Sequence, residues 1–177
     1  MAELSFCVAA SPINDLIRFQ LAHSTWALTS LLEHAATLPT SKLEEDLGIG
    51  PGSLRENLAH TIECVYFFAD NFAGREYVER VGFADRARTL AGLRSMMSES
   101  QRELRDAILN AFERGLGEQV YWPNAPAKAL PTAAAICQVF DHAALHRTQC
   151  INMLKRLGVR PVPDLDPMTF QAAGLPW

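Results

Sequence analysis

Residues 136–157, ICQVFDHAALHRTQCINMLKRL, carry the pattern that decides the fold of this chain. Apolar side chains recur there at intervals of three and four residues, the spacing of one face of an α-helix that packs against a core. The residues of this stripe are Ile136, Val139, Ala143, His146, Cys150, Met153 and Leu157. Because such a face must be buried against another element, the segment predicts a helix with helical neighbours.

Three other segments repeat the same periodicity. We expect helices over about residues 12–38, 53–72, 86–114 and 131–157, bounded by prolines, glycines and a Ser-x-x-Glu capping pattern at residue 53. Helices of this length with no strand-like alternation predict an all-α fold, an up-and-down type four-helix bundle.

The connections differ in length and composition. We expect a long polar first connection over residues 40–52, irregular structure in residues 118–131, and an irregular proline-rich tail from residue 160. A chain of 177 residues with 49% hydrophobic content is long enough for one core and short for two. The sequence therefore predicts a single domain over residues 1–177.

Composition narrows the possible partners. Charged residues make up 20% of the chain, the net charge is -4, and the two signs are interspersed, so we expect no nucleic-acid partner. No apolar run approaches the roughly 20 residues that cross a bilayer. The first residues, MAELSFCVAASP, carry a glutamate and too short an apolar stretch for a signal peptide. These features predict a soluble cytoplasmic protein without a membrane partner.

Two histidines stand out within the last predicted helix. His142 and His146 lie four residues apart, so they share one helix face a turn apart and can bind one divalent cation together. His60 lies in another amphipathic segment, and facing helices of a bundle can bring it to the same place. The alternative is that these are core-edge histidines satisfied by hydrogen bonds.

The four cysteines form no CxxC pair and lie in apolar surroundings, which favours reduced, buried thiols over a disulfide framework. Cys64 lies one turn beyond His60, and Cys150 one turn beyond His146. Each could therefore face the same site, where a thiolate is a strong zinc ligand. Simple burial is the commoner fate of a cysteine.

Three stretches together resemble the DinB-like (DinB/YfiT-like) superfamily of metal-binding four-helix bundles. They are IRFQLAHSTWALTSLLEHAATLP at 17–39, SLRENLAHTIE at 53–63, and DHAALHRTQCINMLKRLGVRPVPDLD at 141–166, which has the form of the superfamily's HxxxHRxQ helix. The resemblance covers most of the chain. It implies that His60, His142 and His146 are the metal ligands, since all three expected histidines are present.

The resemblance also implies a homodimer with a solvent-open pocket beside the metal. Relatives of this kind include transferases and an isomerase that use low-molecular-weight thiols such as bacillithiol or mycothiol. We therefore expect a small-molecule substrate, a divalent metal with zinc or nickel as the first choices, and a metal-dependent thiol S-transferase or hydrolase. The alternative is a non-catalytic metal-binding or ligand-sensing bundle, because a fold does not transfer a reaction.

Glu63 is the candidate catalytic residue. It follows His60 by three residues and shares its side of the helix, where it could act as a base or hydrogen-bond a ligand. The alternative is a solvated glutamate on the helix flank. Arg147 and Gln149 follow the last histidine at positions that resemble those of the family, and Arg147 could equally pair with an acidic residue across the bundle.

The remaining histidines and aromatic residues have structural alternatives. His23 and Trp26 lie one turn apart and could form part of the wall of the pocket beside the metal. Core packing is the commoner role of a tryptophan. We expect His34 to cap the carboxyl end of its helix. Tyr121 and Trp122 could cover a pocket mouth or pack their loop against the bundle.

Overall fold

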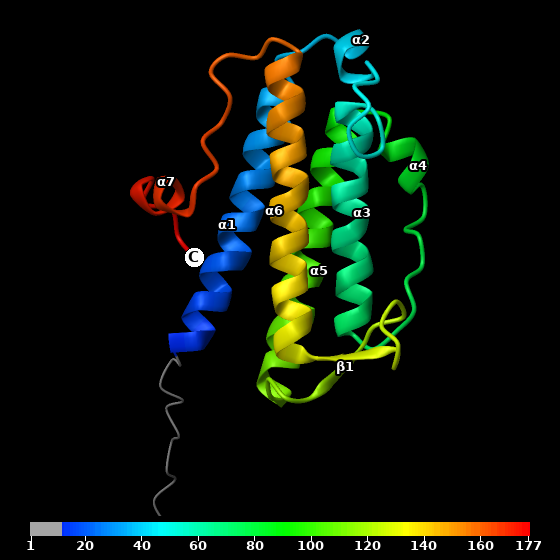
Figure 1. Ribbon diagram of the computed structural model, residues 1–177, viewed down its shortest axis with the longest axis vertical. Coiled ribbons are helices and arrows are strands. Elements are labelled where there is room, and N and C mark those ends of the chain that lie inside the picture. The colour runs from blue at the N-terminus through cyan, green and yellow to red at the C-terminus, as the bar shows by residue number, and fades with distance from the viewer. Residues whose placement is uncertain (1–11) are drawn as a thin grey trace, which may run out of the picture.

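Four long helices dominate residues 12–177, the part of the chain that this computed structural model describes. They are α1 (Pro12–Ala35), α3 (Leu54–Phe72), α5 (Leu90–Arg114) and α6 (Thr132–Arg156). Both α1 and α3 pack against α5 and α6, which makes a four-helix bundle (Figure 1). The predicted all-helical class is confirmed. Within the described range, no helix is long and apolar enough to cross a membrane.

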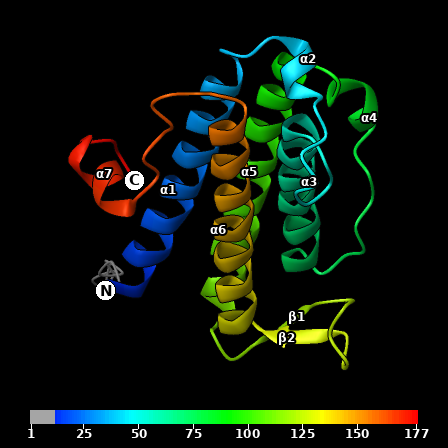
Figure 2. The same cartoon turned by 45° about the horizontal axis from the view of Figure 1, so that its top comes forward.

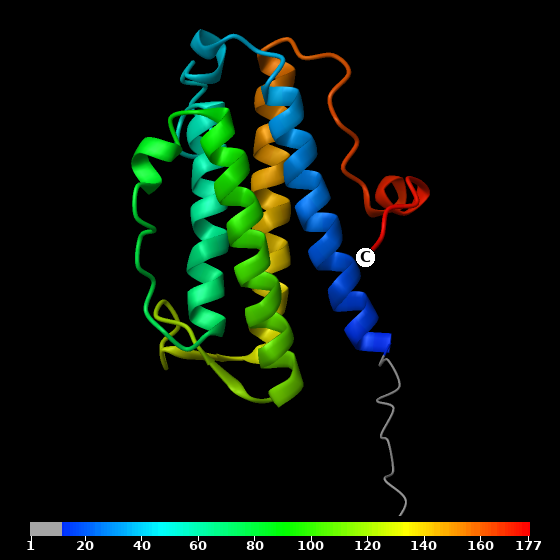
Figure 3. The ribbon, with the colours of Figure 1, turned by 180° about the vertical axis from the view of Figure 1, so that it is seen from behind.

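The direction of the helices departs from a simple up-and-down order. Helices α3 and α5 run the same way, whereas α1 and α6 run the opposite way (Figure 3). At one end, Arg55 of α3 donates a hydrogen bond to the carbonyl of Ala87, just before α5. At the other end, Arg114 of α5 donates to the carbonyl of Phe72. The chain must therefore cross the length of the bundle between α3 and α5, in residues 73–89.

This crossover is held to α3 by the buried carboxylate of Asp70, which is 1% exposed. Asp70 accepts hydrogen bonds from Arg75 (2.7 Å) and Arg80 (2.8 Å), and Arg80 also pairs with Glu103 of α5. Burial acts to raise the pKa of Asp70, but the two arginines outweigh it and hold that pKa below its ordinary value. The crossover contains the short helix α4 (Phe83–Arg86).

The first connection is long, as predicted, and contains the short helix α2 (Thr40–Leu43). Helix α1 ends at Ala35, three residues earlier than expected. The predicted capping box at the start of α3 is confirmed. The Ser53 hydroxyl accepts from the backbone N–H of Glu56, and the Glu56 carboxylate accepts from that of Ser53.

Two segments predicted to be irregular contain regular structure. Residues 118–131 form an antiparallel hairpin of β1 (Gln119–Tyr121) and β2 (Ala129–Pro131), which closes one end of the bundle (Figure 2). The tail forms α7 (Pro167–Ala172), capped by the Asp166 side chain. Both elements are too short to show a periodicity in sequence. Cys7 and the amino-terminal stretch discussed above lie outside the described residues.

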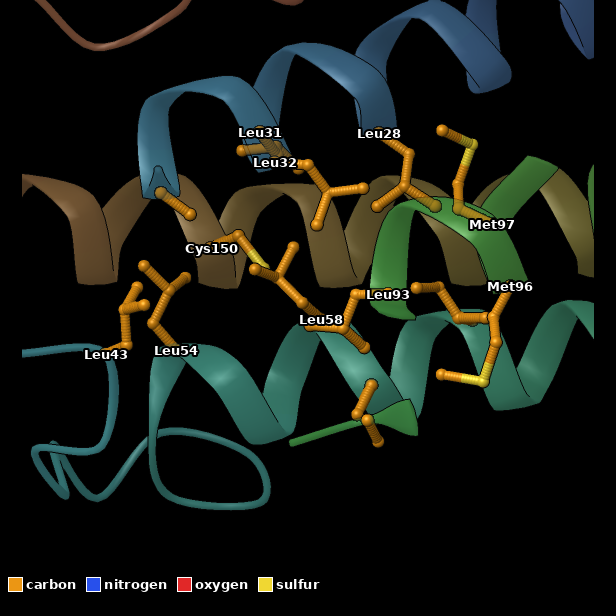
Figure 4. Packing of buried hydrophobic residues seen from close by; sticks show 14 of the residues in the cluster. Leu28, Leu31, Leu32, Leu43, Leu54, Leu58, Leu93, Met96, Met97 and Cys150 are labelled. Atoms are coloured by element: carbon orange, nitrogen blue, oxygen red, sulfur yellow. The ribbon is translucent and has the colours of Figure 1, made fainter. Parts of the chain in front are cut away.

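The buried apolar residues form two clusters, one in each half of the bundle. Figure 4 shows the cluster between the carboxyl-terminal halves of α1 and α6 and the amino-terminal halves of α3 and α5. The second cluster fills the opposite half, next to the hairpin. Along α6, His142 and His146 separate Val139 of the second cluster from Cys150 of the first. The histidines therefore lie where the two clusters meet.

Candidate metal centre

The three predicted ligand histidines come together between α3 and α6. The ring of His146 lies 4.4 Å from that of His142 and 4.8 Å from that of His60, measured between centroids. The rings of His60 and His142 are 6.4 Å apart. His146 is thus the central member of the group, in contact with both of the others.

The donor atoms have the spacing of metal ligands. The Nε2 atoms of His142 and His146 are 3.4 Å apart. Two nitrogens bound to one tetrahedral ion at about 2.0–2.1 Å lie roughly 3.3 Å from each other. The spacing of this pair on α6 therefore fits a shared divalent ion.

A cysteine joins the histidines. The Sγ atom of Cys64 lies 3.5 Å from Nε2 of His60, one turn earlier on α3. The ligand atoms of Cys64, His60 and His146 all lie within 4.8 Å of one another. Burial raises the pKa of the Cys64 thiol to about 12. Cys150, by contrast, lies among the leucines of the first apolar cluster and not in this group (Figure 4).

Burial favours the uncharged form of His142 and His146. Burial, followed by the neighbouring imidazoles, lowers the pKa of His142. Burial is also the main cause that lowers the pKa of His146, which is 6% exposed. Neutral imidazole is the form that binds a metal, so the residues present fit a divalent ion.

Gln149 fixes the orientation of His146. Its Oε1 atom lies 2.8 Å from Nδ1 of His146. Because an amide oxygen can only accept, Nδ1 carries the proton and Nε2 presents its lone pair to the centre. Gly50 (φ +55°) permits this packing, since a Cβ there would lie 2.7 Å from Oδ1 of Asn57 and 3.3 Å from Oε1 of Gln149.

The Gln149→Ala variant should bind zinc about 10- to 100-fold more weakly, the cost of losing an outer-shell partner of a ligand histidine. Competition with a chromophoric chelator measures this affinity. Thr148→Ala is the matched control, because Thr148 is exposed and its hydroxyl bonds only within α6, to the carbonyl of Ala144. Equal affinity in the two variants would show that Gln149 does not orient the ligand.

A cavity of about 610 Å³ opens beside the centre, and His60, Cys64 and His142 lie on its wall. Much of the remaining wall is aromatic, formed by Phe67, Phe68, Tyr77 and Trp122. Trp122 is buried and stacks on Phe68 at 5.5 Å between ring centroids. Trp122 therefore has both of the roles that the sequence left open. It packs its loop against the bundle, and it forms part of the cavity wall. Tyr121 instead donates to Glu76.

Glu63 lies on the cavity wall, and its Oε1 accepts a hydrogen bond from the Tyr77 hydroxyl at 3.2 Å. Burial, then the charge of Glu63, raises the pKa of Tyr77, so this phenol stays protonated and donates. Tyr77 could not be identified from its spacing, because the residue lies in the crossover and outside any helical pattern. Asn124 and Gln138, also on the wall, were likewise not identified.

His23 and Trp26 do not lie on the wall of this cavity, so the expectation that they could line it is wrong. Both pack against Phe170 of α7 on the other side of α1, and Nε2 of His23 lies 2.9 Å from the carbonyl oxygen of Leu165. The reason is that their face of α1 meets the carboxyl-terminal segment and not α3. His34 lies in the last turn of α1, and its Nδ1 atom lies 2.8 Å from the carbonyl oxygen of Ser30, one turn earlier in the same helix.

Arg147 is half-buried, and burial lowers its pKa. Within residues 12–177 it forms no ion pair, so the alternative of an acidic partner across the bundle is not found there. Asp141, one residue before the first histidine of α6, is exposed.

Comparison with known proteins agrees with this architecture. The family model described as DinB family matches residues 17–173. This range contains all four long helices apart from the first turn of α1, and it includes every residue of the candidate centre. A search of the curated proteins gives no match. The chain belongs to the DinB family.

Proposed function

We propose that this protein is a divalent-metal-dependent enzyme that uses His60, His142 and His146 to activate a small thiol, in the manner of an S-transferase, or water. The observation that carries the proposal is the cavity, because it opens directly onto two of the three histidines. Three histidine ligands leave a coordination position for a substrate, as in catalytic zinc sites.

A bound zinc or nickel ion would lower the pKa of a thiol or water at that position and so supply a nucleophile near neutral pH. The protein contributes uncharged donors, since burial favours neutral His142 and His146. Neutral ligands leave the full positive charge of the ion to act on the substrate.

The cavity wall favours a small electrophile with an apolar or aromatic body. Four aromatic side chains can pack against such a molecule, whereas Asn124 and Gln138 can hydrogen-bond a polar group on it. Glu63 is the one carboxylate on the wall, so it is the group we expect to take up the proton of the thiol or water.

The Glu63→Gln variant should lower kcat about 100-fold while leaving the metal content unchanged, because a missing base slows proton transfer without removing a ligand. Steady-state rates beside elemental analysis measure both quantities. Glu113→Gln, at an exposed position of α5, is the control and should keep full activity. An unaltered rate in Glu63→Gln would remove this residue from the mechanism.

The test of the function is the loss of free thiol in the presence of a panel of electrophiles, with protein loaded with zinc, loaded with nickel, or stripped of metal. Small thiols such as bacillithiol, mycothiol and 2-mercaptoethanol would be compared. A rate that requires the metal supports thiol transfer. Metal-dependent cleavage of esters or amides instead would assign the water reaction, and no metal-dependent rate with either panel would contradict the proposal.

The competing function is a non-catalytic metal-binding or ligand-sensing protein, and the proximity of Cys64 favours it, since four protein ligands make a closed structural site. A structural ion contributes directly to folding. A His142→Ala protein that folds stably without metal would therefore argue against this alternative. As part of the proposal, we expect a homodimer in the cytoplasm, and light scattering would measure the oligomeric state.

A further inference from the structure

Cys64 supplies a fourth donor that the three-histidine scheme does not use. Its sulfur lies 3.5 Å from Nε2 of His60. With a metal–sulfur bond of about 2.3 Å and a metal–nitrogen bond of about 2.0–2.1 Å, the edge between sulfur and nitrogen of a tetrahedral site is roughly 3.6 Å. The side chains already have the separation that a common ion requires.

A hydrogen bond from the thiol to His60 would account for that one contact. It would not account for the third member of the group, since His146 comes from a different helix. Its ligand atom nevertheless lies within 4.8 Å of those of both His60 and Cys64. His146 is also nine-tenths buried and has its other nitrogen held by Gln149. Helices α3 and α6 thus bring three metal-ligating atoms close together.

We propose that Cys64 is a ligand of the metal in the resting protein and holds the position that a substrate thiol takes in the reaction. When the metal binds, the Cys64 thiol releases its proton to solvent and its thiolate coordinates the ion. In the reaction, the incoming substrate thiol gives its proton to Glu63 and takes the position at the ion as a thiolate, and the displaced Cys64 thiolate takes up a proton from solvent. Because the substrate must displace Cys64, this residue controls access to the metal. The proposal rests on the metal site of the proposed function. A soft sulfur donor would also favour zinc over hard ions such as magnesium.

The experiment loads the full chain with Co²⁺ in place of the native ion and records its near-ultraviolet spectrum, where cobalt–thiolate charge transfer absorbs. We expect about one cobalt per chain and an intense band in the unaltered protein. Cys64→Ala should keep cobalt bound through the histidines and lose the band. Cys137→Ala is the matched control, because Cys137 is exposed on α6 and should leave the band in place.

Adding 2-mercaptoethanol to the cobalt-loaded Cys64→Ala protein should restore the band, as the added thiol enters the freed position. Bound cobalt without the band in the unaltered protein, or a band that persists in Cys64→Ala, would overturn the role of Cys64 while leaving the metal site in place. Failure of the unaltered protein to bind cobalt, shown by elemental analysis, would overturn the site itself.

If Cys64→Ala does not fold, X-ray absorption at the zinc edge of the zinc-loaded, unaltered protein decides the question. We expect one sulfur neighbour at about 2.3 Å beside nitrogen neighbours at about 2.0–2.1 Å. A shell of nitrogen and oxygen neighbours alone would contradict ligation by Cys64.

Discussion

Replacing His146 by alanine should lower the affinity for zinc by at least about 100-fold, more than the loss of an outer-shell partner costs. The reason is its central position, since its ring contacts both His60 and His142. We expect about one ion per chain in the unaltered protein and less than about one tenth of an ion in His146→Ala. Elemental analysis of protein purified without a nickel column or chelator gives this number.

His60→Ala and His142→Ala should lose metal as well. His34→Ala is the control, because His34 bonds within α1 and does not belong to the centre. If His60→Ala, His142→Ala and His146→Ala all kept about one ion per chain, these histidines would not be metal ligands and would serve only in packing.

The Asp70→Ala variant should lose about 3 kcal/mol of the free energy of unfolding, the typical cost of removing one partner of a buried ion pair. Asp70 is 1% exposed and binds both Arg75 and Arg80, so its loss removes the carboxylate that the two guanidinium groups share, and Arg80 keeps its pairing with Glu103. Urea denaturation measures the change. Asp85→Ala is the matched control, since the Asp85–Arg88 pair is exposed and should contribute less than about 1 kcal/mol.

The same carboxylate gives the stability a defined pH dependence. The pKa of Asp70 is lower in the folded protein than its ordinary value of 3.8, so the unfolded chain protonates first as the pH falls. The contribution of Asp70 is therefore complete above that ordinary value and is lost as the pH falls through the lower, folded value. Asp70→Asn should remove this part of the acid dependence, and an identical acid profile in the variant would contradict the assignment.

Local patterns in the sequence were sufficient to predict the four long helices. Ser53 and Glu56 fix the start of α3 through hydrogen bonds between near neighbours, so their spacing alone predicts them. The direction of α5 follows from the crossover in residues 73–89, which is held to α3 by the contact between Asp70 and Arg80, and hydrophobic periodicity does not predict such a contact. The hairpin was missed for a similar reason, because its three-residue strands pair only with each other.

The histidines of the centre were predictable because they lie on regular helices. A separation of four residues puts His142 and His146 on one face, and the bundle places His60 opposite. Cys64 follows the same rule, but burial alone explains a cysteine equally well, so the sequence left its role open. Tyr77 and Trp122 reach the cavity from connecting segments, and their position depends on tertiary packing. The face of α1 that carries His23 meets α7, which the sequence did not predict.

The histidines lie between the two apolar clusters, so a metal ion bound there would join the two halves of the core. All four donors come from α3 and α6, so a bound ion would act as a cross-link between these two helices at the level where hydrophobic packing changes from one cluster to the other. Helices α1 and α5 would stay outside this cross-link. Any substitution that separates α3 from α6 would therefore weaken metal binding, even at a distance from the histidines.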